Sequence, residues 1–359
     1  MITRWNHAKR MPIKAVAVLG GLLAALGAHP GKAAEPGLLG RCWPAEALAA
    51  REGERAPVKG AAGHKQPIPV LDNSARGVTA GANAVSGRII RRVKLPPGKK
   101  LVALTLDLCE QAGEISGYDG AIIDYLRANR IKATVFTGGK WFMTHAERAQ
   151  QLIADPLLEI GSHGWAHRNV RGLTGRALID EIRGPEPAFQ TQRAALLSSQ
   201  CAAKHPKDAA VVQSRLGHYR FPFGACNPAA VAALAENGLS AIQWDVSTGD
   251  SSKGESAEAI ARTLLHEVRP GSIILAHANG RGHHTAAALE LAMPKLKAKG
   301  FTFVTISELI AAGQPEFAES CYDHRPGDTD RYDALFQPRP KAPETTSGKP
   351  DPASSILSR

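Results

Sequence analysis

The sequence predicts an α/β domain in which parallel strands and helices alternate. Seven short apolar runs alternate with helical patterns over residues 100–314, which is typical of βαβ units. Polar residues gather where these runs end, and barrels place their catalytic groups at such positions. A length of roughly 220 residues suits a single closed barrel. An open doubly wound sheet is the alternative, but the glycine-rich dinucleotide motif typical of such sheets is absent.

The first run, 101–107, is nearly all apolar, as expected of a strand buried on both faces. The remaining predicted strands cover 132–137, a run that ends at Ser162, 218–221, 239–246, 272–276 and 301–304. Helical patterns cover 118–128, a segment after Thr144, 173–197, 228–236, 256–268, 285–299 and 307–312. Thr144 with Glu147, and Thr305 with Glu308, have the spacing of capping boxes.

The two ends of the chain differ from this domain. Residues 1–33 combine a basic lead with the apolar run Ala15–Ala28 and small residues, which predicts a signal peptide and a secreted or periplasmic protein. An apolar run of about fourteen residues is short for a membrane span, so no span is expected in the mature form. Residues 34–99 are expected to wrap over the barrel, with a short helix at 44–51 and an edge strand at 88–93. Residues 315–336 are expected to pack on the barrel, and 337–359 to be disordered.

Net charge and cysteine content indicate which partners and which redox environment the protein meets. Removing residues 1–33 lowers the net charge from +11 to +6, because that segment holds five basic residues and no acidic ones. Such a charge favours anionic envelope polymers, and the scattered basic residues do not suggest nucleic-acid binding. Five cysteines in an exported protein leave at least one thiol free. We expect disulfides Cys42–Cys321 and Cys201–Cys226, with Cys109 reduced.

A pair of histidines, His163 and His167, suggests a metal site. Their spacing lets both imidazoles converge on one ion. Other polar residues also lie at the ends of predicted strands, namely Asp107, Glu110, Arg220, Asp245, Asp250 and His277. The sequence therefore predicts a catalytic rim.

Residues 101–312 resemble the polysaccharide deacetylases of the NodB-homology group, carbohydrate esterase family four. Five ordered motifs carry the resemblance: Thr105-Leu106-Asp107-Leu108, His163-Gly164-Trp165-Ala166-His167, Arg220-Phe221-Pro222-Phe223-Gly224, Ser247-Thr248-Gly249-Asp250-Ser251 and Ile274-Leu275-Ala276-His277. The family's fold is a distorted (β/α)7 barrel, which agrees with the seven predicted strands. The resemblance implies a secreted, metal-dependent hydrolase that removes N-acetyl groups from peptidoglycan or chitin-like glycans.

The resemblance also implies a role for each matching residue. His163 and His167 would bind a divalent ion, Zn²⁺ in our expectation with Co²⁺ as the alternative, which makes water nucleophilic at neutral pH. Asp107 would be the base, and Arg220 would hold it in place. The Phe223 N–H would stabilise the oxyanion. His277 would protonate the leaving amine, with Asp250, or Asp245 as the alternative, keeping it charged.

One position departs from the family pattern. Leu108 stands where the family has its second Asp, the third metal ligand, and leucine cannot bind an ion. We expect Glu110 to replace it. The alternatives are Asp119, Asp107 as ligand with Glu110 as base, or a weakened site. Cys109 could bind a soft metal, but we expect a small apolar filler.

Two further residues are candidate contacts to the glycan. Trp165 has a ring that can stack on a sugar, with a place in the core as its alternative. Asn279 opens a glycine-rich loop, 279–285, that can lie over substrate. Two other functions remain open: hydrolysis of a small amide or cyclic imide, and glycan binding without catalysis, which Leu108 suggests. The oligomeric state is not predicted.

Overall fold

The structure, a computed structural model, describes residues 37–60, 66–70 and 87–333. All of them belong to one structural unit. The predicted signal peptide and the predicted disordered tail lie outside the described residues. Among the described helices, none is both long and apolar enough to cross a membrane.

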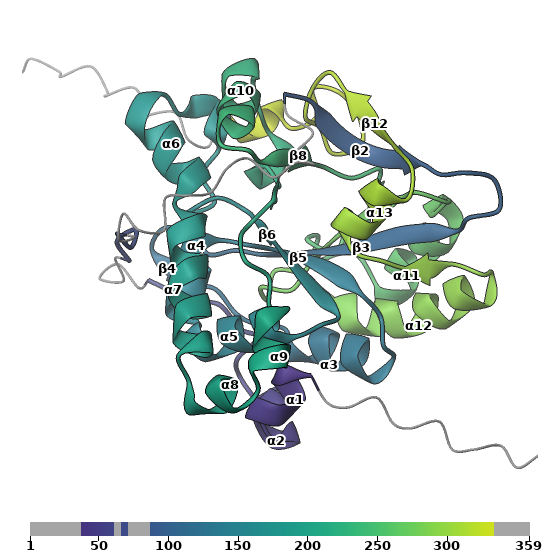
Figure 1. Cartoon of the computed structure of the whole chain (residues 1–359). Helices are drawn as coiled ribbons and strands as arrows, with labels where there is room; N and C mark the ends of the chain where they lie inside the picture. Colours follow the sequence, from purple (N-terminus) through teal and green to yellow (C-terminus); the bar gives the residue numbers. More distant parts are fainter. Residues whose placement is uncertain (1–36, 61–65, 71–86, 334–359) are drawn as a thin grey trace, which may run out of the picture. The chain divides into compact units, whose positions relative to one another are not determined.

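A ten-stranded sheet forms the centre of the molecule, and most of its strands run parallel (Figure 1). The order is β12-β2-β8-β7-β6-β5-β3-β10-β9, with β11 beside β3 and only β12 antiparallel to its neighbour. The strands are β2 (Ile89–Lys94), β3 (Leu101–Leu108), β5 (Ala133–Thr137), β6 (Leu158–Ser162), β7 (His218–Tyr219), β8 (Ser240–Ile242), β9 (Val246–Ser247), β10 (Ile273–His277), β11 (Thr302–Phe303) and β12 (Gln314–Ala318). A separate pair consists of β1 (Val58–Lys59) and β4 (Glu114–Ile115).

The sheet curls because one stretch of chain, 240–247, takes part at two places. Its first half, β8, pairs with β7, and its second half, β9, pairs with β10. Strand β2 lies in the opening between these halves, since it pairs with β8 and forms an isolated bridge from Arg92 to Ser272. The predicted fifth strand, 239–246, is therefore divided. The result is a distorted barrel.

Helices surround the sheet (Figure 1). One group, α4, α5 and α7, packs together, and α11 packs on α12. The helices are α1 (Leu38–Cys42), α2 (Ala45–Leu48), α3 (Gly120–Ala128), α4 (Gly139–Thr144), α5 (Ala146–Ala154), α6 (Gly175–Arg183), α7 (Pro185–Leu197), α8 (Gln200–Lys204), α9 (Pro206–Ala210), α10 (Pro228–Glu236), α11 (Ala257–Glu267), α12 (Thr285–Ala298) and α13 (Ile306–Ala311).

The side chains of strand β3 alternate between the two faces of the sheet. Val102, Leu104, Leu106 and Leu108 join the apolar core formed with the outer helices, whereas Ala103 belongs to a second cluster with residues of β2, β5 and β10. Successive side chains of a strand point to opposite faces. Asp107 therefore shares the face of Ala103, inside the barrel, and Leu108 faces the helices.

The flanking segments contribute strands to the barrel. The expected edge strand at 88–93 is instead an inner strand, β2, because β12 covers its other side. Its residues explain this position, since Ile89 and Ile90 are buried in two different clusters. The short helix expected at 44–51 is present as α2.

One of the two expected capping boxes is present. Thr305 and Glu308 cap α13 reciprocally. The pair Thr144 and Glu147 does not, because His145 is the N-cap of α5 and the Thr144 hydroxyl bonds elsewhere.

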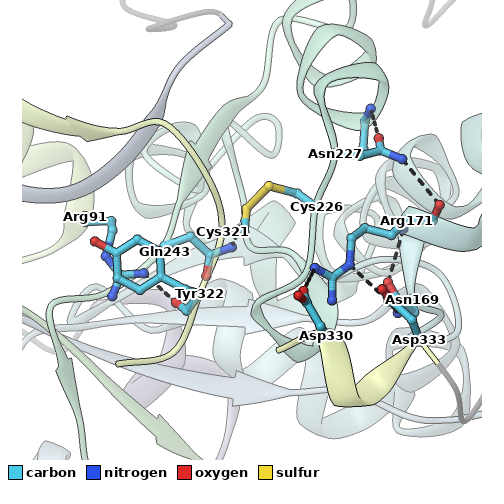
Figure 2. The surroundings of a disulfide bond; sticks show 11 residues. Arg91, Asn169, Arg171, Cys226, Asn227, Gln243, Cys321, Tyr322, Asp330 and Asp333 are labelled. Carbon is cyan, nitrogen blue, oxygen red and sulfur yellow. Dashed lines mark hydrogen bonds and ion pairs between the residues drawn. A yellow bond between two sulfur atoms is a disulfide. The ribbon is translucent and has the colours of Figure 1, made fainter. Parts of the chain in front are cut away.

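The disulfides join different partners from those expected. Cys42 pairs with Cys201 and Cys226 with Cys321, while Cys109 is free, as predicted. The expected pairing assumed that the two ends of the fold are tied together. Instead, α1 packs beside α8, and the chain after β12 returns to the loop after β7 (Figure 2).

Removing the Cys226–Cys321 disulfide should destabilise the fold. This bond spans 95 residues, and a disulfide across a loop of that size typically contributes about 2–5 kcal/mol by restricting the unfolded chain. We expect the double variant Cys226→Ser, Cys321→Ser to lose this free energy of unfolding in a urea titration. A non-reducing peptide map that joins Cys42 to Cys321 would contradict the pairing.

Candidate functional site

The predicted catalytic side chains gather at one rim of the barrel. Asp107 lies near the end of β3, and its register partner in β10 is His277. His163 directly follows β6, and Arg220 directly follows β7. Because parallel strands end at the same edge, these four residues share the carboxyl-terminal rim.

A buried ion pair joins two of them inside the barrel. The Arg220 guanidinium lies 2.9 Å from one Asp107 oxygen, and the two residues are 0% and 4% exposed. The guanidinium also lies over the Phe136 ring, 4.1 Å from its centroid. Both contacts fix the direction of the Asp107 carboxylate.

Arg220 also orients the first histidine. Its backbone carbonyl lies 2.9 Å from His163 Nδ1 and can only accept, so Nδ1 carries the hydrogen. The other nitrogen, Nε2, is 3.3 Å from the second Asp107 oxygen. Burial lowers the pKa of His163, which favours the neutral imidazole that metal ions require.

A buried carboxylate shapes the loop that carries the second histidine. His167 has a positive φ of 52°. Glu181 of α6 accepts hydrogen bonds from the backbone N–H groups of Ala166, at 3.1 Å, and Arg168, at 2.9 Å. Burial, opposed by these bonds, raises the pKa of Glu181 to about 7. Sequence reasoning missed Glu181, because nothing in a helical pattern distinguishes it from a surface carboxylate.

A second buried pair lies across the rim. His277 Nδ1 is 2.7 Å from one Asp250 oxygen, and the other oxygen accepts from the His277 backbone N–H and from the Thr285 hydroxyl. Burial alone would lower the pKa of His277, but the charge and hydrogen bond of Asp250 raise it above its usual value. His277 is thus kept protonated to higher pH.

Asp245, the alternative partner for His277, lies elsewhere. Its carboxylate accepts from the Ile273 N–H at 2.8 Å and the Ser272 hydroxyl at 2.9 Å. Ile273 begins β10 and His277 ends it. Asp245 therefore sits at the opposite end of that strand.

The expectation that Glu110 joins the two histidines is wrong in this structure. Its fully buried carboxylate accepts from the Thr144 hydroxyl at 3.0 Å and the Ser116 N–H at 3.2 Å, and Lys140 Nζ is 3.5 Å away. Asp119, another alternative ligand, pairs with Arg55 at 2.8 Å. Both carboxylates are thus held by other partners.

Cys109 occupies the place expected for Glu110. Its sulfur and one nitrogen each of His163 and His167 lie within 4.8 Å of one another. These three residues are the group of possible metal ligands found among the described residues. Burial raises the pKa of the Cys109 thiol. The sequence predicts that Cys109 is a small apolar filler, and its position beside the imidazoles appears only in the structure.

Of the two residues expected to contact the glycan, Asn279 is fully buried and Trp165 is half-buried. Asn279 is 0% exposed and donates through Nδ2 to the Cys109 carbonyl at 3.0 Å and to its sulfur at 3.3 Å. Trp165 packs against the main core, and a methyl group on Gly139 would lie 2.2 Å from its ring. Asn279 therefore supports Cys109, whereas Trp165 is half-buried and packs against the edge of the core.

The donors at the rim fit a divalent ion. Because His163 Nδ1 bonds to the Arg220 carbonyl, Nε2 is the nitrogen that can bind an ion. The Nδ1 atom of His167 is buried and has no hydrogen-bond partner in another described residue. Buried polar atoms are rarely left unpartnered without a reason.

Phe223 links the rim to the C-terminal segment. It lies in the turn Pro222–Gly224 with a φ of 61°, a region that strains residues other than glycine. Its ring contacts the His167 ring, with centroids 4.3 Å apart, and the Tyr332 ring, at 5.1 Å. The C-terminal segment therefore reaches the site.

Two anchors hold that segment, as Figure 2 shows. The Cys226–Cys321 disulfide fixes its start. Near its end, Arg171 pairs with Asp330 at 2.8 Å and with Asp333 at 3.0 Å.

Asp250→Asn should lower the pKa of His277. The substitution removes the charge that raises this pKa and leaves the burial that lowers it. We expect the His277 imidazole to lose its proton at lower pH than in the parent, measured by NMR titration of histidine ring signals. An unchanged or higher pKa would contradict the role of Asp250.

Comparison with known proteins agrees with this arrangement. The family model "Polysaccharide deacetylase" matches residues 94–242. A peptidoglycan-N-acetylglucosamine deacetylase of Bacillus cereus is 30% identical over 219 residues, which cover 60% of this chain and 70% of the relative. Another, PgdA of Listeria monocytogenes, is 28% identical over 214 residues, or 58% of this chain and 39% of the relative. The chain thus spans well under half of the Listeria protein.

Solved structures share the fold. The Bc1960 peptidoglycan N-acetylglucosamine deacetylase superposes with a TM-score of 0.51 at 23% identity, covering 63% of this chain and 94% of that one. BA3943 of Bacillus anthracis, described as a pseudoenzyme of carbohydrate esterase family four, gives 0.51 at 21% identity, covering 65% and 72%. At these identities the likeness shows the fold alone. The Bacillus cereus relative, at 30% identity over 70% of its length, establishes that the chain belongs to the polysaccharide deacetylase family.

Proposed function

We propose that this chain is a secreted, metal-dependent deacetylase that removes N-acetyl groups from amino-sugar polysaccharides. The observation that carries the proposal is the pairing at the rim: Asp107 with Arg220, and His277 with Asp250, on either side of the histidines. A base and an acid held in this way are what amide hydrolysis needs. A protein that only binds glycan has no use for them.

The names of the relatives support the substrate class. The Bacillus cereus and Listeria proteins are named peptidoglycan-N-acetylglucosamine deacetylases, and a Rhizobium leguminosarum relative is named chitooligosaccharide deacetylase. We extend to this chain the class of N-acetylated glycan that these names share. The positive charge of residues 34–359, +6, favours anionic wall polymers.

In this proposal Asp107 accepts the proton of the attacking water. Arg220 donates a hydrogen bond to the carboxylate and keeps it aimed at the rim. His163 and His167 would hold a divalent ion, Zn²⁺ in our proposal with Co²⁺ as the alternative, which would supply a Lewis acid for the water and the amide carbonyl.

His277 and Phe223 serve the other half of the reaction. The Phe223 N–H is our candidate donor to the developing oxyanion. His277 donates its proton to the leaving amine, and Asp250 keeps it protonated until then. Cleavage leaves acetate and a free amino sugar.

The two disulfides support export. Both join residues distant in the sequence, and such bonds persist in oxidising compartments. We propose a periplasmic or secreted location, in line with the expected signal peptide.

Asp107→Asn and His277→Gln should each lower the rate of acetate release by about 10²–10⁴-fold, the usual contribution of a general base or acid. The assay measures acetate from chitooligosaccharides and peptidoglycan fragments, with Zn²⁺, Co²⁺ or a chelator. His266→Gln is the matched control, because His266 is exposed in the last turn of α11. Release should fall with the chelator.

Three outcomes would contradict this proposal. Acetate release that survives both substitutions would show that the rim is not the catalytic site. No release with any metal, together with intact glycan binding, would leave a non-catalytic glycan-binding protein. Activity on a small cyclic imide but on no glycan would favour the small-amide alternative.

A further inference from the structure

Cys109 is the one cysteine of the five that forms no disulfide, and it is buried beside two imidazoles. Its neighbour Leu108 stands where the family supplies a carboxylate ligand, and Leu108 lies in the apolar core. The site therefore holds two imidazoles, and the position of the family's second carboxylate is apolar, while the Asp107 carboxylate beside His163 is the proposed base.

The end of β3 lies beside the histidines, and the sulfur is in the residue that follows it. Side chains alternate along a strand, so Asp107 and Leu108 face opposite sides. Cys109 lies one residue beyond the strand, and its sulfur lies within 4.8 Å of one nitrogen of each histidine. Glu110 is fixed by Ser116, Thr144 and Lys140. Among the described residues, Cys109 is the one whose donor atom lies within 4.8 Å of both histidine nitrogens.

The spacing of the three donors suits a metal ion. Zn²⁺ bonds of about 2.0–2.3 Å in tetrahedral geometry place ligand atoms roughly 3.3–3.8 Å apart. The three donors already lie within 4.8 Å of one another, so a shift of about 1 Å is enough to reach bonding distances.

The surroundings support a ligand sulfur. Asn279 Nδ2 donates to Cys109 Sγ at 3.3 Å and to its carbonyl at 3.0 Å, and a donor on the sulfur stabilises a thiolate. The Arg220 carbonyl fixes the His163 ring at the opposite nitrogen. Ligands of metal sites are commonly oriented by such outer hydrogen bonds.

We propose that Cys109 is a metal ligand, so that the ion of this chain is bound by one thiolate and the imidazoles of His163 and His167. The inference rests on the proposed function only in assuming that the histidine pair binds an ion. On binding, the thiol releases its proton to solvent and the sulfur bonds to the metal. A thiolate in place of a carboxylate favours Zn²⁺ and Co²⁺ over Mg²⁺ and Mn²⁺.

Cobalt spectroscopy tests the ligand directly. The full chain is freed of metal with a chelator and titrated with Co²⁺, whose bond to sulfur gives a near-ultraviolet charge-transfer band. We expect the band in the parent and in Glu110→Gln, and its loss in Cys109→Ser and Cys109→Asp. In a Zn²⁺ competition experiment, Cys109→Ser should bind Zn²⁺ at least about tenfold more weakly than the parent. Asn279→Ala should keep the band but lose about 10–100-fold in Zn²⁺ affinity.

Circular dichroism confirms that each variant is folded, and Cys109→Asp supplies an oxygen ligand if Cys109→Ser binds too weakly. A parent that binds Co²⁺ without the band, or binds none, overturns the proposal. So does Cys109→Ser with parental Zn²⁺ affinity, or loss of the band in Glu110→Gln.

Acetate release separates this inference from the proposed function. A band without release means that the thiolate site exists and the deacetylase function fails. Release without a band means that the function holds and the ligand assignment fails.

Discussion

The ion pair between Arg220 and Asp107 is the interaction on which the rim depends. It lies inside the barrel, where a charge without its partner would cost several kcal/mol. The same arginine contacts His163 through its carbonyl and Phe136 through its guanidinium. One residue at the end of β7 therefore sets the positions of groups from β3, β5 and β6.

Much of this arrangement follows from the sequence. The apolar runs of β3 and β10 predict buried parallel strands, and parallel strands bring Asp107 and His277 to one edge without further information. The pairing of His277 with Asp250 is the one expected from the fourth and fifth motifs of the family. These features depend on local patterns and on topology, which a sequence displays.

The features that could not be predicted depend on register and on contacts between distant segments. Whether Cys109 or Glu110 reaches the histidines depends on where β3 ends and on which partners hold each side chain. Glu110 is bound by groups from 116, 140 and 144, which no pattern joins to it. The disulfide partners and the place of β2 between β8 and β12 likewise depend on packing between remote parts of the chain.

The disulfide pattern has a consequence for biosynthesis. Cys42 bonds to Cys201 and must bypass Cys109, the next cysteine along the chain. In the export that we propose, oxidation in the order in which cysteines leave a translocation channel would instead join Cys42 to Cys109 and consume the thiol of the rim. The native bonds then form only by thiol–disulfide exchange, a slow process without a catalyst. Maturation of this chain should therefore depend on a disulfide isomerase, or on burial of Cys109 before oxidation reaches it.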